Sequence, residues 1–121
     1  MRRPLLLAGV AAGAAGALAL PAPALAAYDS AHCYNINSTG CTTRSIPAET
    51  PGHWLNYSVD AGPICSADWK VVDAGNGVTV GNGHVSRNGH AGSWIGGLYG
   101  SYYLRIYNSC PGSEGTISNF D

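Results

Sequence analysis

The sequence predicts an all-β protein, a small antiparallel β-sandwich or barrel held together by two disulfides. Short segments of alternating polar and apolar residues recur over residues 53–121, glycine-rich turns separate them, and the chain contains four cysteines. After residue 26 no segment shows apolar residues at the 3.6-residue spacing of a helix, and the abundant glycine disfavours helices further. We therefore expect one domain of strands and turns.

Residues 1–26 have the pattern of an export signal. Arg2 and Arg3 supply a positive start, residues 5–20 form an apolar run, and residues 24–26 (Ala-Leu-Ala) provide the small residues of a cleavage site. A membrane anchor is the alternative, but the run is weakly apolar and prolines follow it at once, which favours cleavage. We expect a secreted, monomeric protein with no membrane attachment after cleavage.

The charge balance limits the class of partner. Removal of the signal leaves four basic residues against seven acidic ones, a net charge of −3. A chain of this charge lacks the broad basic surface that nucleic acid or anionic lipid requires. We expect no nucleic-acid partner and no cofactor.

The four cysteines are expected to form two disulfides, because an exported chain folds where thiols oxidise. Of the three possible pairings we favour Cys33 with Cys41 and Cys65 with Cys110, since the first closes one short loop and the second brackets the strand-rich half. In the loop-entropy model these closures contribute about 2.5 and about 4 kcal/mol to stability. No C-x-x-C motif suggests a metal site instead.

The N-terminal part of the mature chain carries little periodic signal. Residues 27–52 are expected to form an irregular segment, closed by Pro47, Pro51 and Gly52, and the β-sandwich domain is expected over residues 53–121.

Strands are expected where polar and apolar residues alternate between glycine-rich turns. In chain order they are predicted at residues 53–59, 68–72, 78–80, 93–95, 101–108 and 115–118. The second and third form a predicted hairpin. In the first, Leu55, Tyr57 and Val59 share one face. Residues 81–83 (Gly-Asn-Gly) are expected to turn, and residues 86–92 to form a loop.

The segment 101–108 has the clearest alternation. If Leu104 and Ile106 face the core, the residues that alternate with them face solvent, which are Tyr103, Arg105 and Tyr107. Ordinary cross-strand pairing of tyrosines is an alternative explanation of the same pattern.

We predict a binding surface at Tyr103, Arg105 and Tyr107, with Trp94 as an added candidate. Tyrosine and arginine offer large amphipathic contact area at a low cost in side-chain entropy. Planar tyrosine rings also suit sugar rings. The favoured function is therefore a non-enzymatic secreted protein that binds an extracellular protein or a carbohydrate.

Two other functions remain open. The first is a hydrolase inhibitor that presents residues 84–92 or the loop between Cys33 and Cys41. The second is a small metal-dependent enzyme that uses His84 and His90, although no H-E-x-x-H, G-x-S-x-G or phosphate-binding motif is present. We expect no enzymatic activity.

The alanine- and glycine-rich leader resembles those of secreted actinobacterial proteins. Residues 100–107, followed by Gly115 and Thr116, resemble the last strand pair of bacterial pre-peptidase C-terminal domains, which are β-sandwiches appended to secreted hydrolases. That resemblance implies a β-sandwich.

Residues 79–85 (Thr-Val-Gly-Asn-Gly-His-Val) and 89–91 (Gly-His-Ala) are similar to the second half of tendamistat-type α-amylase inhibitors of Streptomyces. Those inhibitors are exported all-β proteins with two sequential disulfides. They inhibit through a Trp-Arg-Tyr hairpin between their first two cysteines, whereas residues 34–40 here contain neither tryptophan nor arginine. The resemblance implies a fold and transfers no inhibitory residue.

Overall fold

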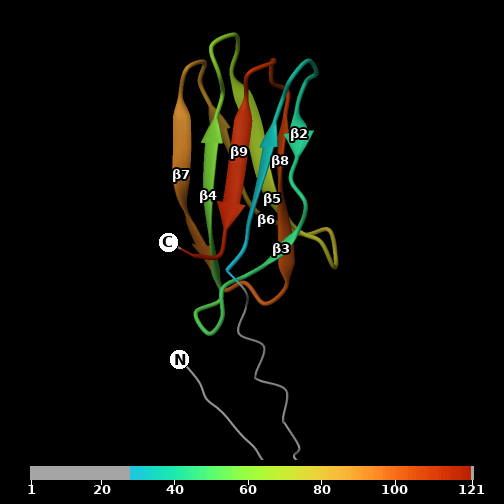
Figure 1. Cartoon of the computed structure of the whole chain (residues 1–121), viewed down its shortest axis with the longest axis vertical. Coiled ribbons are helices and arrows are strands. Elements are labelled where there is room, and N and C mark those ends of the chain that lie inside the picture. Colours follow the sequence, from blue (N-terminus) through green and yellow to red (C-terminus); the bar gives the residue numbers. More distant parts are fainter. Residues whose placement is uncertain (1–27, 121) are drawn as a thin grey trace, which may run out of the picture.

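The computed structural model describes residues 28–120, and its regular structure is entirely β (Figure 1). The strands are β1 (Ser30–Tyr34), β2 (Cys41–Thr42), β3 (Ile46–Pro47), β4 (Trp54–Asp60), β5 (Ala67–Asp73), β6 (Thr79–Val85), β7 (His90–Gly96), β8 (Ser101–Tyr107) and β9 (Glu114–Ser118). Within this range no helix is long and apolar enough to cross a membrane. The predicted signal peptide lies outside the described residues.

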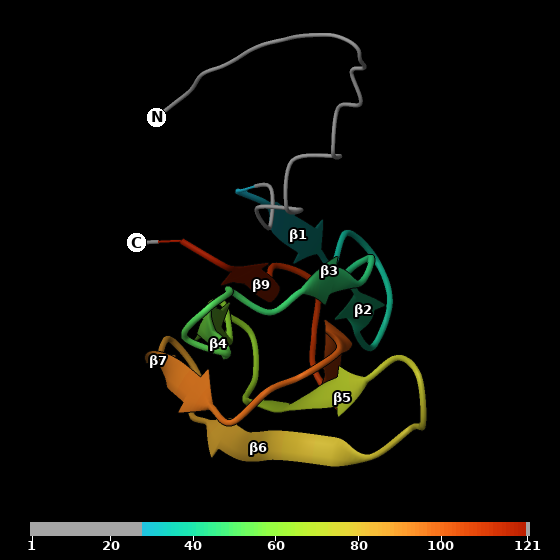
Figure 2. The same cartoon turned by 90° about the horizontal axis from the view of Figure 1, so that it is seen from below.

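The strands form two antiparallel sheets that pack face to face. One sheet has the order β1-β9-β4-β7, and the other has the order β2-β8-β5-β6, with the short β3 also paired to β8. Figure 2, seen along the strands, shows the two layers, which approach each other where β6 lies beside β7 and β1 beside β2. The predicted all-β sandwich is confirmed.

The core lies between the inner faces of the two sheets. Leu104 and Ile106 of β8 are 0% and 1% exposed, and they belong to the same apolar cluster as Leu55 and Ile117 of the facing sheet. A Cβ at Gly115 of β9 would lie 2.6 Å from Leu104 Cδ2 and 2.9 Å from Ile106 Cδ1. Glycine at this position therefore lets the two sheets approach, and each buried aliphatic side chain contributes about 1.5–3 kcal/mol.

The Gly-Asn-Gly segment at 81–83 does not turn, contrary to expectation, but lies within β6 opposite β5. Its glycines accommodate Trp69, which is 5% exposed and packs against the Tyr57 ring with a centroid distance of 4.4 Å. A Cβ at Gly83 would lie 2.8 Å from Trp69 Nε1. The glycines are needed here because the indole lies directly against the β6 backbone.

The segment 27–52, expected to be irregular, carries three of the strands. β1 pairs along its whole length with β9, while β2 and β3 pair with β8, so this segment is part of the sandwich. The inward side chains of β1 belong to Ala31 and Cys33, which are too small to give a strong apolar alternation. The strands β2 and β3 have two residues each, which is too short for a periodic signal.

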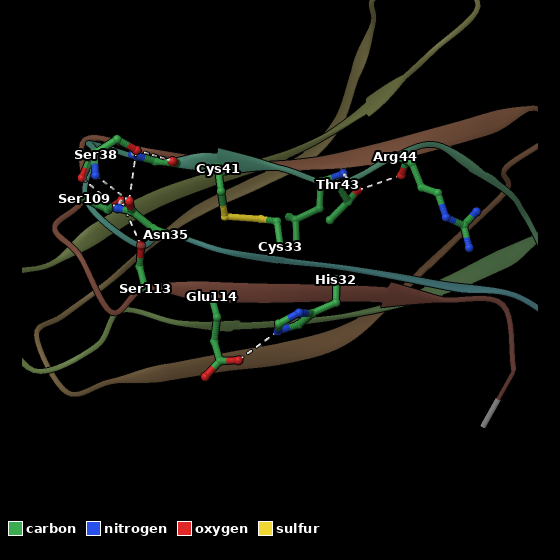
Figure 3. Close-up of a disulfide and its surroundings, with 12 residues drawn as sticks. His32, Cys33, Asn35, Ser38, Cys41, Thr43, Arg44, Ser109, Ser113 and Glu114 are labelled. Carbon is green, nitrogen blue, oxygen red and sulfur yellow. Dashed lines mark hydrogen bonds and ion pairs between the residues drawn. A yellow bond between two sulfur atoms is a disulfide. The ribbon is translucent and has the colours of Figure 1, made fainter.

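Both predicted disulfides are present. The bond between Cys33 and Cys41 joins β1 to β2 and so connects the two sheets (Figure 3). The bond between Cys65 and Cys110 joins the β4–β5 connection to the β8–β9 connection. Formation of both bonds indicates an oxidising environment.

Asn35, which is 1% exposed, anchors the loop that the first disulfide closes (Figure 3). Its Nδ2 donates to the backbone oxygens of Ser38 at 2.9 Å and Cys110 at 3.0 Å, and to Ser109 Oγ at 3.3 Å. Its Oδ1 accepts from the backbone N–H and the hydroxyl of Ser38. These bonds hold the β1–β2 loop against the β8–β9 connection and fix where β2 begins.

Candidate functional site

Tyr103, Arg105 and Tyr107, here called the β8 strip, point away from the core. The alternation along β8 buries the intervening residues, leaves the two tyrosines half-buried and exposes the arginine. β8 lies inside its sheet, between β5 on one side and β2 and β3 on the other. The strip therefore runs along the middle of a sheet face and not along an edge.

Neighbouring strands bring further polar side chains beside the strip. The register places Thr42 of β2 opposite Arg105, Arg105 opposite Lys70 of β5, and Lys70 opposite Asn82 of β6. Residues opposite each other in a sheet project from the same face, so these four side chains form one row across it. Sequence reasoning identified Arg105 but missed Lys70, because the pairing of β5 with β8 joins strands that are not consecutive in the chain.

Tyr107 is in contact with both cations of this row. Lys70 Nζ and Arg105 Cζ each lie 5.7 Å from the centroid of its ring. These distances are within the range of cation–π attraction, which is worth about 0.5–1 kcal/mol at an exposed site. These contacts favour side-chain conformations in which the ring and the two charged groups lie together.

Asp68 is the carboxylate opposite Tyr107, and its oxygens are engaged by neighbours. Asn108 Nδ2 donates to it at 3.0 Å and His84 Nδ1 at 2.7 Å. The hydrogen bond from Asn108, followed by that from His84, lowers the pKa of Asp68 below its ordinary value. Asp68 therefore stays ionised and bonded to these two partners.

A groove of about 240 Å³ runs beside the strip, between β8 and the chain that leads into β2. Ser38, Thr39 and Thr42 line one side, and Arg105 and Tyr107 line the other. The disulfide of β2 and the Asn35 hydrogen bonds fix the first side, so the groove is built on a rigid part of the fold. Its walls offer hydroxyl groups, an aromatic ring and a guanidinium.

Trp94 does not join the β8 strip. It lies on β7, in the other sheet, opposite Asn56, and it is 64% exposed. A Cβ at Gly96 would lie 2.7 Å from Trp94 Cζ3, so the indole extends along β7 over that glycine. The four predicted binding residues thus occupy two opposite faces, because sequence alternation does not reveal to which sheet a strand belongs.

A second aromatic surface was missed at the sequence level. A hollow of about 480 Å³ is lined by Tyr28, Trp54 and Phe120, with Glu49 and Asn119 as its polar groups. The Tyr28 and Phe120 rings meet edge to face with centroids 5.7 Å apart. Pairing of β1 with β9 brings these distant residues together, and no local motif could have indicated it.

The histidines are dispersed. His84 Nδ1 is bonded to Asp68 on one sheet, whereas His90 Nδ1 lies 2.9 Å from Asp60 Oδ1 on the other. Among residues 28–120 no group of three or more His, Cys, Asp or Glu side chains could hold a metal ion. The geometry gives His84 and His90 no shared site.

The two loops considered for an inhibitor are both tied to the body of the protein. Most of residues 84–92 belongs to β6 and β7, so the loop expected over 86–92 shortens to a turn in which Gly89 N donates to Ser86 O at 2.7 Å. Asn88 N donates to Gly62 O at 2.8 Å, which packs this turn on the β4–β5 connection. The loop between the first two cysteines is held by Asn35, as described above.

Comparison with protein-family models, with curated proteins and with solved structures finds no match to this chain.

Proposed function

We propose that this protein is a secreted, non-enzymatic binding protein that recognises an extracellular ligand through the β8 strip. The observation that carries the proposal is the outward projection of Tyr103, Arg105 and Tyr107 from the middle of a sheet face. Tyrosine and arginine are the residue types that most often dominate binding surfaces.

The preorganisation of the strip supports the same function. Lys70 and Arg105 each lie 5.7 Å from the centroid of the Tyr107 ring, and the groove beside it is bounded by a disulfide-linked strand. Side chains that are already ordered lose less entropy when a ligand binds. A rigid aromatic surface on a small sandwich is therefore suited to binding.

Secretion is supported by two independent features. The two disulfides require an oxidising environment, and residues 1–26 have the pattern of a cleavable export signal. A ligand outside the cell, either a protein or a polysaccharide, follows from that location.

The proposal is tested with Tyr103→Ala combined with Tyr107→Ala. The purified protein is assayed against immobilised soluble and insoluble polysaccharides and against extracellular proteins of the source culture. We expect the double variant to lose at least about tenfold in affinity for whatever the unaltered protein binds, because it removes the main contact area of the strip.

The matched control is Tyr99→Ala, which removes a tyrosine that is 79% exposed outside the strip and should leave binding unchanged. Equal binding by the unaltered protein and the double variant would exclude the strip as the binding surface.

A further inference from the structure

We infer that the β8 strip together with Lys70 recognises an anionic polysaccharide. In this arrangement Arg105 and Lys70 bind carboxylate or sulfate groups of the polymer, while its sugar rings lie against Tyr103 and Tyr107. The inference rests on the proposed binding function and adds the chemical class of the ligand.

Two like charges lie directly opposite each other on this face. Lys70 and Arg105 are partners in the register of β5 and β8, and Thr42 and Asn82, which complete their row, are uncharged. Like charges directly opposite each other on a sheet are destabilising. An anionic group bound between them would relieve that repulsion.

The carboxylates of the protein itself leave these two cations without an ionic partner among the described residues. Neither Lys70 nor Arg105 takes part in an ion pair among residues 28–120, although acidic residues outnumber basic ones in this part of the chain. The nearest carboxylate on the same face is Asp68, two residues along β5, which is bonded to Asn108 and His84. The two cations therefore remain available to an external anion.

The two cations lie beside an aromatic ring. Lys70 Nζ and Arg105 Cζ are each 5.7 Å from the Tyr107 ring centroid, so a ligand meets a pair of positive groups next to that ring. A guanidinium binds carboxylate or sulfate through two parallel hydrogen bonds, and an ammonium adds a point charge. This combination suits a sugar ring that carries an acidic substituent.

The shape and polarity of the surface favour a polysaccharide over an acidic protein. Tyr103 and Tyr107 are four residues apart on one strand, which separates them by about 13 Å along the strip. The adjoining groove is lined by Thr39 and Thr42, whose hydroxyls match those of a sugar. Lysine, which stands here beside Arg105 as Lys70, is by contrast depleted at protein interfaces.

The experiment uses polymer pairs that differ mainly in charge. Polygalacturonate is compared with its methyl ester, and dextran sulfate with dextran, which separates carboxylate from sulfate recognition. Poly-L-glutamate represents an acidic polypeptide. We expect binding to at least one of the two anionic polysaccharides, at least about tenfold weaker binding to its neutral counterpart, and weakening as salt screens the charges.

The variant is Lys70→Gln combined with Arg105→Gln, and the matched control is Arg87→Gln, which removes an exposed cation from the β6–β7 turn. The double variant should lose at least about tenfold in affinity for the anionic polymer and most of the salt dependence, since two charge-assisted contacts disappear. The control should stay within about twofold. Urea unfolding of each variant verifies that it is folded.

The possible results separate this inference from the proposed function. The ligand class is wrong if the protein binds the neutral polymers, or poly-L-glutamate, as tightly as it binds the anionic polysaccharides. If the double tyrosine variant loses that binding, the strip is still the binding surface. An anionic polymer bound equally by the Lys70→Gln/Arg105→Gln variant also overturns the ligand class. Binding of any polymer that the tyrosine substitutions leave unchanged overturns the proposed function itself.

Discussion

At the scale of single residues, function and stability depend on side chains that reach beyond their own strand. Asn35, which follows β1, forms hydrogen bonds with the segment that follows β8. Lys70 lies opposite Arg105 only because β5 pairs with β8. Alternation along β8 correctly indicated which way Arg105 points. It could not indicate Lys70 or Asn35, whose roles depend on partners 35 or more residues away.

Asn35→Ala should lower the free energy of unfolding by about 3 kcal/mol. The substitution removes the bonds that Asn35 Nδ2 donates to Ser38 O, Cys110 O and Ser109 Oγ, and the two that its Oδ1 accepts from Ser38. Each such bond contributes about 0.5–1.5 kcal/mol to stability. Urea unfolding measures the effect. Asn37→Ala, at an exposed position of the same loop, is the control and should change stability by less than about 0.5 kcal/mol. Equal stability of the two variants would show that the Asn35 bonds contribute little.

At the scale of elements, the strands with strong alternation were predictable and the weak ones were not. The predicted segments 53–59 and 101–108 correspond to β4 and β8 within one residue at each end, because their buried residues are large and regularly spaced. β6 was shortened in the prediction, since its glycines resemble a turn until Trp69 is seen to lie on them. The assignment of Trp94 to the opposite face required the sheet order, which no local pattern contains.

Gly83→Ala should destabilise the protein by about 1–3 kcal/mol, the usual cost of overpacking. The added methyl group would lie 2.8 Å from the indole of Trp69, a rigid ring that is already enclosed in the core. Thermal or urea unfolding measures the change, and Trp69 fluorescence reports on its surroundings.

Gly75→Ala is the matched control for this prediction. In that turn the methyl group would meet only the flexible carboxylate end of Asp73, so we expect a change below about 0.5 kcal/mol. Similar stability of Gly83→Ala and the control would mean that the indole can move aside.

At the scale of the whole molecule, the two disulfides have different tasks. Cys33–Cys41 joins the sheets beside the groove, whereas Cys65–Cys110 closes a much longer stretch of chain. Of the three possible pairings, the spacing of the cysteines favoured the one that forms. Its consequence for the groove was not predictable, because β2 had no recognisable signal.

Replacing Cys65 and Cys110 by alanine should cost about 4 kcal/mol, and replacing Cys33 and Cys41 about 2.5 kcal/mol, because the longer loop restricts the unfolded chain more. Urea unfolding of the two double variants gives the order. Ligand affinity should fall more in the variant that lacks Cys33 and Cys41, because that disulfide holds the wall of the groove. A reversed order in stability would show that loop entropy is not the dominant contribution of these bonds.

The pairing of β1 with β9 gives the molecule a polarity. The chain before β1 and the chain after β9 lie at one end of the sandwich, whereas β2 lies toward the other end (Figure 1). The Tyr28 and Phe120 rings meet at the first end, and the groove beside Tyr107 adjoins β2. A protein attached to a support at Tyr28 or at Phe120 would therefore present the same end outward. Attachment at either of these two residues should yield an oriented layer with its grooves facing the solution.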